Sequence, residues 1–307
     1  MSTQNINNLV ELFFIKYKEQ KKDNILLTSL KDNDNNFTWE KTFHSIKKLS
    51  SEIKKYANKG DRCLLISENR PEWFITDLSV MLSEAITVPA YTTYAEKDYE
   101  YIIENCNPKL IFVSNQEQFN KVKEIIKKKS FVTKIFSFEQ LDIDSESYIN
   151  VNKLFFNLDY QDLKIPDLSI KRKDPACIIY TSGTQGNPKG VILSHGGILN
   201  NCDGALNILK PLLTDQTRFL TWLPLSHSYE HTVQFVQISV GAKIFYAESI
   251  EKLIKNMNDC KPQLMTAVPR FYQNLFQKIN ASFNKATGLK KSLVLKMLEL
   301  GTKKINK

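Results

Sequence analysis

The sequence lacks the features of several classes of protein. Its five cysteines are widely scattered and include no CxxC pair, which argues against a metal or disulfide framework and favours reduced thiols. Nowhere do 18 apolar residues run together, and the first twenty residues show no basic segment followed by a long apolar one. We therefore expect neither secretion nor a membrane span, but a cytoplasmic protein, with peripheral contact to a membrane left open.

Arginine is scarce, since only five of the 42 basic residues are arginines. With 33 acidic residues the formal net charge is +9, which suits an anionic ligand or membrane surface but also plain solubility. We expect no nucleic-acid partner. What the sequence does have is 42% hydrophobic residues over 307 positions, enough for a sizeable core in one large or two ordinary domains.

Strands and helices alternate in the first half of the chain. Apolar runs predict strands at 62–67, 85–90 and 109–114, with helices from Pro71 to about Glu84 and from Glu96 to Asn105. This βαβαβ order implies an α/β fold with a parallel, doubly wound sheet. Further elements are predicted as helices at 7–19, 39–59 and 121–130, a short strand at 35–39, and a polar connection at 159–173.

The most informative segment is TSGTQGNPKG, residues 181–190, between predicted strands at 176–180 and 191–195. Glycines permit positive φ and close backbone approach, hydroxyls add donors, and a lysine adds a mobile positive charge. These properties suit a polyphosphate, although the segment is not a Walker A loop. A hairpin held by its own hydroxyls is the structural alternative. The residues concerned are Thr181, Ser182, Gly183, Thr184, Gly186, Lys189 and Gly190.

This segment resembles the signature phosphate loop of the adenylate-forming (AMP-binding) superfamily, in which the position of Gln185 is usually threonine or serine. Three further segments, at 60–94, 220–232 and 266–281, resemble the long-chain fatty acyl-CoA synthetase branch of that superfamily. The resemblance implies the layered sheets of a large N-terminal domain. Residues 1–307 would be the N-terminal part of the adenylation domain, with its C-terminal part and the small C-terminal domain absent.

The resemblance also implies a reaction: a fatty acid is activated with ATP to acyl-AMP, and the acyl group is then transferred to CoA. ATP and Mg²⁺ would be required, with CoA as co-substrate. The implied phosphate ligands are Thr181, Ser182, Gly183, Thr184, Gly186 and Lys189. His227 would stand near the reacting carboxylate. The implied acyl-pocket residues are Tyr229, Glu230, His231, Val268, Pro269, Arg270 and Phe271, and no residue is assigned to a metal.

Later motifs of the family do not occur in the 307 residues: a glutamate for Mg²⁺, an aspartate for the ribose, a hinge arginine and a catalytic lysine. The expectation is a truncated or partial form of a long-chain fatty acid-CoA ligase, with little activity alone. Two alternatives are a non-catalytic nucleotide-binding remnant and one half of a split enzyme that a separate C-terminal polypeptide completes.

Several of these residues have simpler interpretations. His227 and His231 begin a predicted helix and could serve only as a cap or a core group. Tyr272 and Phe276 are spaced as core residues of a helix. Glu84 stands where the family often has glycine, which concerns local packing.

A remote alternative starts from residues 227–231, which read HSYEH and so match the HxxEH pattern of zinc metallopeptidases, with Glu299 as a third ligand. Such a short pattern is common, and a metallopeptidase would leave the phosphate loop unexplained.

Overall fold

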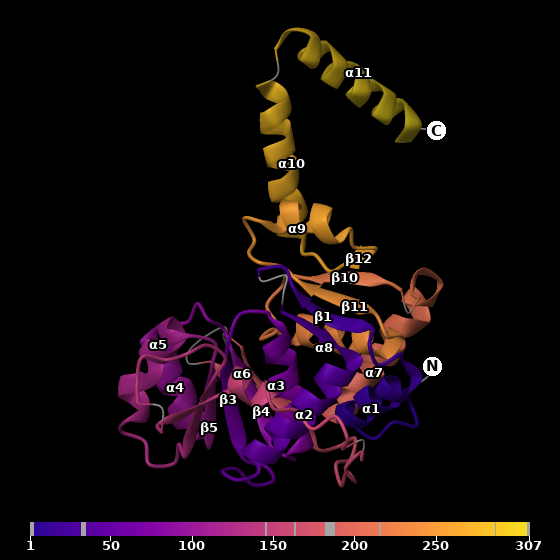
Figure 1. Ribbon diagram of the computed structural model, residues 1–307. Coiled ribbons are helices and arrows are strands. Elements are labelled where there is room, and N and C mark those ends of the chain that lie inside the picture. The colour runs from indigo at the N-terminus through magenta and orange to yellow at the C-terminus, as the bar shows by residue number, and fades with distance from the viewer. Residues whose placement is uncertain are drawn as a thin grey trace. The chain divides into compact units, whose positions relative to one another are not determined.

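The computed structural model describes residues 3–31, 35–144, 146–162, 164–181, 188–214, 216–285 and 287–305 (Figure 1). The chain divides into two compact units, residues up to 265 and residues from 266 onward. Each unit is treated by itself below.

A seven-stranded sheet forms one half of the first unit (Figure 1). All its neighbouring strands are parallel except β8 and β9, which form an antiparallel hairpin at one edge. The predicted strands in this region are confirmed. In spatial order the strands are β7 (Tyr148–Asn150), β6 (Lys134–Ser137), β5 (Leu110–Val113), β3 (Arg62–Ile66), β4 (Ile86–Ala90), β8 (Pro175–Thr181) and β9 (Lys189–Ser194).

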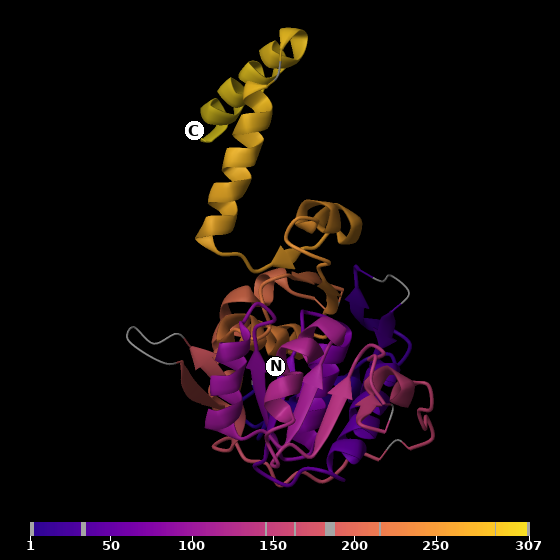
Figure 2. The same ribbon diagram turned by 90° about the vertical axis from the view of Figure 1, so that its left-hand side faces the viewer.

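The central strands of this sheet are buried on both faces. Cys63 and Leu65 of β3 join one hydrophobic core, and the alternating Leu64 and Ile66 join a second. Helices α4 (Glu96–Cys106) and α5 (Gln116–Ile126) supply the second core and cover that face, in front of the sheet in Figure 2. The parallel, doubly wound arrangement predicted from the βαβαβ pattern is therefore present.

A second sheet has five strands, in agreement with the layered sheets that the resemblance implied, but of its strands only the short β2 was predicted from the sequence pattern. Its order is β12 (Leu264–Met265), β10 (Arg218–Thr221), β11 (Lys243–Tyr246), β1 (Ile25–Ser29) and β2 (Asn36–Thr38). Strand β1 pairs in parallel with β11, with Leu27 opposite Ile244.

Helices lie between the two sheets and form the larger core with residues of both (Figure 1). Helix α3 contacts β1 of one sheet and β4 of the other. These helices are α1 (Leu9–Glu19), α2 (Trp39–Ile53), α3 (Pro71–Leu82) and α8 (Ser228–Val240). The unit also contains α6 (Val151–Phe155), α7 (His195–Leu209), the short helix η1 (Lys210–Leu212) and α9 (Leu253–Cys260).

Some predicted boundaries were wrong. Helix α2 ends at Ile53 rather than near residue 59, because a turn follows that reaches Gly60 at φ +80°. The basic helix predicted at 121–130 begins five residues earlier, at Gln116, where Asn115 caps it.

The second unit consists of α10 (Pro269–Asn284) and α11 (Gly288–Ile305). Tyr272 and Phe276, predicted to be core residues, are 60% and 67% exposed, so that prediction was wrong. Spacing by four places them on one face of α10, and in the described part of the second unit that face is exposed. Across the described ranges, no helix is both long and apolar enough to cross a membrane.

Candidate functional site

A cavity of about 460 Å³ lies in the first unit, where strands of both sheets end. It is lined by residues at or just after the carboxyl ends of six parallel strands, namely Ser29, Ser67, Tyr91, Glu139, Trp222 and Ala247. In open α/β sheets, ligands bind in the crevice outside the carboxyl ends of the strands. The cavity is therefore the first place to look for a ligand.

The predicted phosphate loop starts at this same edge of the seven-stranded sheet. Strand β8 runs parallel to β4 and ends at Thr181, which pairs with Lys189 at the start of β9, and both residues are exposed. The hydroxyl of Tyr180 donates to Oδ1 of Asn105 at 2.5 Å and fixes the end of β8 to α4. Strands β8 and β9 therefore form a hairpin, and Thr181 and Lys189, where the two strands meet the loop, are exposed to solvent. The candidate phosphate ligands Ser182, Gly183, Thr184 and Gly186 lie outside the described residues.

Gly190 is needed for close packing rather than for an unusual φ. A Cβ atom at this position would lie 3.0 Å from Cγ2 of Ile178 and 3.2 Å from the ring of Tyr180. Its φ is not positive, and the close contact that it permits is with these two side chains of β8.

His227 caps the N-terminus of α8. Its Nδ1 accepts a hydrogen bond from the backbone N–H of Tyr229 at 3.2 Å, as the cap interpretation predicts. Because Nδ1 is the acceptor, the neutral imidazole carries its proton on Nε2. His227 is exposed, so this N–H can donate to a ligand at the start of the helix.

His231 lies in the core between the sheets rather than at the cavity. Its Nε2 is 2.8 Å from Oδ2 of Asp77 on α3, and its Nδ1 is 3.6 Å from Sγ of Cys177 on β8. Burial alone would lower the pKa of His231, but the Asp77 carboxylate and the Cys177 sulfur together raise that pKa to about 10. Of its neighbours, Glu230 is also buried, whereas Tyr229 is 51% exposed.

The zinc alternative finds no support in the described part of the chain, which contains no group of three or more His, Cys, Asp or Glu able to hold a metal. His231 is already bonded to Asp77, and Glu299 pairs with Lys303 on its own helix. The acyl-pocket candidates Val268, Pro269, Arg270 and Phe271 stand at the start of α10, in the second unit.

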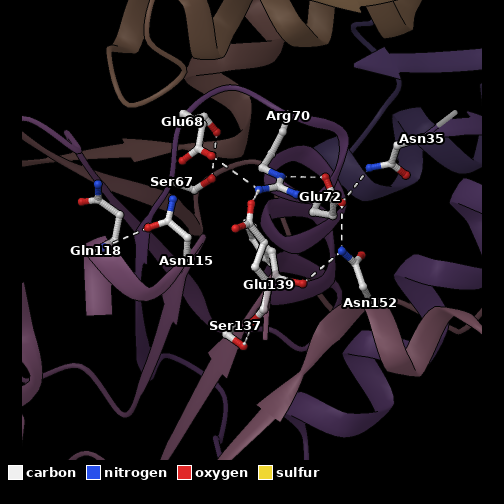
Figure 3. Close-up of polar contacts among 11 residues, drawn as sticks. Asn35, Ser67, Glu68, Arg70, Glu72, Asn115, Gln118, Ser137, Glu139 and Asn152 are labelled. Carbon is white, nitrogen blue, oxygen red and sulfur yellow. Dashed lines mark hydrogen bonds and ion pairs between the residues drawn. The ribbon is translucent and has the colours of Figure 1, made fainter. Parts of the chain in front are cut away.

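A polar network beside the cavity was missed by sequence reasoning (Figure 3). Arg70 contacts buried Glu72 with two nitrogens, at 3.0 and 3.3 Å, and Glu139 with a third contact at 3.0 Å. Asn35 and Asn152 donate to the same Glu72 carboxylate at 2.9 and 3.2 Å. The available signal was a pair of opposite charges flanking Pro71 directly after a buried strand.

The charges in this network compensate one another. Burial would raise the pKa of Glu72, but the Arg70 guanidinium and the asparagine donors hold that pKa below its ordinary value. Glu68 also contacts Arg70, at 3.4 Å. With three carboxylates around one guanidinium, Arg70 is poorly placed to bind an anion, and it instead ties the ends of β3 and β6 together.

Two sheets share a helical layer, and the hairpin of β8 and β9 and the cavity lie at their carboxyl edge, an arrangement that matches the N-terminal domains of adenylate-forming enzymes. The family model described as "AMP-binding enzyme" matches residues 14–306, so the chain belongs to the AMP-binding enzyme family.

Curated relatives are long-chain acyl-CoA synthetases. Long chain acyl-CoA synthetase 3 of Arabidopsis thaliana is 28% identical over 271 residues, which cover 83% of this chain and 40% of the relative. Long-chain-fatty-acid–CoA ligase 5 of Rattus norvegicus is 29% identical over 243 residues, covering 75% of this chain and 35% of the relative. The chain therefore spans about two fifths of the length of these relatives.

Solved structures share the fold at low sequence identity. The anthranilate CoA ligase AuaEII in complex with anthranoyl-AMP superposes with a TM-score of 0.77 at 18% identity, over 89% of this chain and 52% of that one. A putative long-chain-fatty-acid CoA ligase from Rhodopseudomonas palustris CGA009 gives 0.75 at 16% identity, over 89% and 66%. These comparisons support the mixed α/β fold of an adenylate-forming N-terminal domain.

Proposed function

We propose that this protein takes part in the activation of long-chain fatty acids to their CoA thioesters. In the first step a carboxylate oxygen attacks the α-phosphorus of ATP, and pyrophosphate leaves as acyl-AMP forms. In the second step the CoA thiol loses its proton, its sulfur attacks the acyl carbonyl, and AMP leaves. The observation that carries the proposal is the glycine-rich hairpin at the carboxyl edge of a parallel sheet, in a chain of the AMP-binding family.

In this proposal the loop holds the phosphates. Thr181 and Lys189, which face each other at the ends of β8 and β9, would supply a hydroxyl and a positive charge. The backbone N–H groups of the intervening glycine-rich residues would point at one anion, as in other phosphate-binding loops. Charge that develops on phosphate oxygens is then stabilised by groups already in place.

His227 would act at the fatty acid. Its Nε2–H lies at the exposed start of α8, where the helix dipole also favours a carboxylate. Tyr229, exposed in the first turn of α8, would contact the acyl chain. For residues 268–271, in the second unit, an acyl-pocket role is proposed from the family resemblance alone. Buried Glu230 and His231 would act through the packing of α8, because neither side chain is exposed.

Magnesium, which the family resemblance implies, does not have a protein cage among the described residues. Mg²⁺ usually binds substrate phosphates with one or two carboxylates, so the nucleotide itself would supply most of its ligands. We assign no step of the reaction to the metal.

The first experiment is ATP binding by calorimetry, together with fatty-acid-dependent exchange of pyrophosphate into ATP. A hydrogen bond to a charged group contributes about 1.5 to 3 kcal/mol, so Lys189→Ala should weaken ATP binding roughly 10- to 100-fold. Lys128→Ala, which removes an exposed lysine near the end of α5, is the charge-matched control and should leave the affinity unchanged.

The outcomes separate the candidate functions. Exchange that depends on a long-chain fatty acid supports the ligase. ATP binding that Lys189→Ala weakens, without exchange under any acyl substrate, favours a nucleotide-binding protein without turnover. Equal affinities for parent and Lys189→Ala would refute the phosphate role of the loop.

Fatty acid, ATP and CoA are the proposed ligands of a cytoplasmic enzyme. Peripheral membrane contact and a complementing C-terminal polypeptide belong to the same proposal. Flotation with anionic vesicles tests the first, and copurification from the native source tests the second.

A further inference from the structure

The two halves of the proposed site belong to different sheets. The phosphate loop leaves β8 of the seven-stranded sheet at Thr181, whereas His227 follows β10 of the five-stranded sheet. A carboxylate and a phosphorus atom react only when they are held about 3 to 3.5 Å apart. The contacts that join the two sheets at this edge must therefore set the geometry of the reaction.

Asn69 makes one such contact, at the rim of the cavity. It follows β3 of the seven-stranded sheet, and its side-chain amide reaches the loop after β10. Its Nδ2 donates to the carbonyl of Leu223 at 2.7 Å, and its Oδ1 accepts from the N–H of Leu225 at 2.9 Å. The backbone is thus held on both sides of Pro224.

The chemistry of the side-chain amide explains why an asparagine fits here. The C=O of Leu223 and the N–H of Leu225, on either side of Pro224, both face the Asn69 side chain. A primary amide carries one acceptor and one donor group at the spacing that these two backbone groups need. Aspartate would keep the acceptor and lose the donor.

The loop transmits this contact to His227. The backbone N–H of His227 donates to the carbonyl of Pro224 at 3.0 Å. Pro224 lies between the two residues that Asn69 binds, so the contact with Asn69 also fixes the start of α8. The hydroxyl of Ser226 donates to the carbonyl of Ala90, at the end of β4, at 3.1 Å. The four residues before His227 are therefore fixed to β3 and β4, and β4 is the neighbour of β8.

We propose that Asn69 is a positioning residue of the site: its amide fixes the loop at residues 223–225 and thereby sets where the His227 imidazole is presented to substrate. This role rests on the proposed function for its catalytic consequence. It does not depend on that function for its structural one, because the position of His227 can be observed without turnover.

The test compares three variants with the parent protein. Asn69→Ala removes both hydrogen bonds, and Asn69→Asp keeps the acceptor for Leu225 alone. Asn115→Ala is the matched control: Asn115 follows the adjacent strand β5 and caps α5, but its described bonds reach Gln118 rather than the β10–α8 loop (Figure 3). The readouts are the thermal midpoint, the side-chain NMR resonances of ¹⁵N-labelled histidine, and pyrophosphate exchange with its separate kcat and KM.

The histidine spectrum can be interpreted because the chain has four histidines, all described, of which His227 alone is exposed. We expect Asn69→Ala to shift the His227 resonances and to lower kcat roughly 10- to 100-fold, the effect of a displacement of about 1 Å, with KM for ATP nearly unchanged. Asn69→Asp should fall between parent and Asn69→Ala. Asn115→Ala should lower the thermal midpoint without moving the His227 resonances.

Unchanged His227 resonances in Asn69→Ala would overturn the proposal, as would a loss of kcat equal to that of Asn115→Ala. If the parent itself shows no exchange, the proposed function fails, and the His227 resonances decide the positioning role by themselves.

Discussion

Replacing Asp77 with asparagine should change both the stability of the protein and the way that stability depends on pH. Asp77 and His231 are fully buried, and their side chains meet at 2.8 Å between the two sheets. The variant keeps the size of the side chain and removes its charge. A buried imidazolium would then lack its counterion, so we expect His231 to become neutral in the folded variant.

The magnitude follows from proton linkage. The folded-state pKa of His231 is raised to about 10, above the ordinary value of about 6.5, so between these pH values the folded protein binds one proton more than the unfolded chain. The stabilisation is complete below pH 6.5 and is lost as the pH rises toward 10, at about 1.4 kcal/mol per pH unit. From pH 7 to pH 9 the parent should lose roughly 3 kcal/mol through this group.

Urea unfolding at pH 6.5, 7.5 and 9 measures the effect. Breaking a buried ion pair from one side costs about 3 to 5 kcal/mol, so Asp77→Asn should be destabilised by about that amount at pH 6.5 and by much less at pH 9. Asp142→Asn, at an exposed position, should follow the parent at every pH. If Asp77→Asn is destabilised equally at pH 6.5 and pH 9, the Asp77 carboxylate does not keep His231 protonated in the folded protein.

Two further predictions concern a strained residue and a second buried histidine. Glu84 has φ +61°, so Glu84→Gly should be more stable than Glu84→Ala by about 1 kcal/mol in urea unfolding; both variants lose the contacts with Lys59 and Ser169, and equal stabilities would mean that the left-handed backbone costs nothing. Burial lowers the pKa of His195 to about 4, so its contribution to stability is complete above about pH 6.5 and is lost as the pH falls toward 4. Between pH 4.5 and pH 6.5 the free energy of unfolding of His195→Gln should therefore rise by roughly 3 kcal/mol less than that of the parent. An equal rise in both proteins would contradict the lowered pKa of His195.

The seven-stranded sheet could be predicted in large part because its central strands are short, continuous apolar runs between helical patterns. The strands of the five-stranded sheet, apart from β2, could not. Its strands are two to five residues long, and β1 finds its partner β11 more than two hundred positions later, with Leu27 opposite Ile244. Such strands are stabilised by partners that local periodicity does not contain. Local periodicity also predicted too long a helix α2: the residues after Ile53 favour a helix, but they form a turn in the structure.

The candidate site divides in a similar way. Composition and resemblance together single out residues 181–190, since glycines, hydroxyls and a lysine concentrate in one loop. Asn69 and Asp77 escaped notice because one polar residue near a helix start, or within an apolar helix, has no local signature. Their partners Leu223 and His231 each lie 154 positions away, so only the folded chain brings them together.

Asn69 fixes the loop before α8 to the segment after β3, and Asp77 on α3 holds His231 of α8, yet removing each should have a different effect. Loss of the Asp77 charge removes the counterion of a fully buried imidazole, so the consequence falls on stability and on its pH dependence. Loss of the Asn69 amide leaves two backbone groups in a partly buried loop beside a cavity, where water can replace the lost partners. Loss of the Asn69 amide should therefore change the position of the His227 imidazole. A comparison of the two variants therefore separates the stability of the helical layer from the alignment of the site, which the loss of activity in either variant alone would not do.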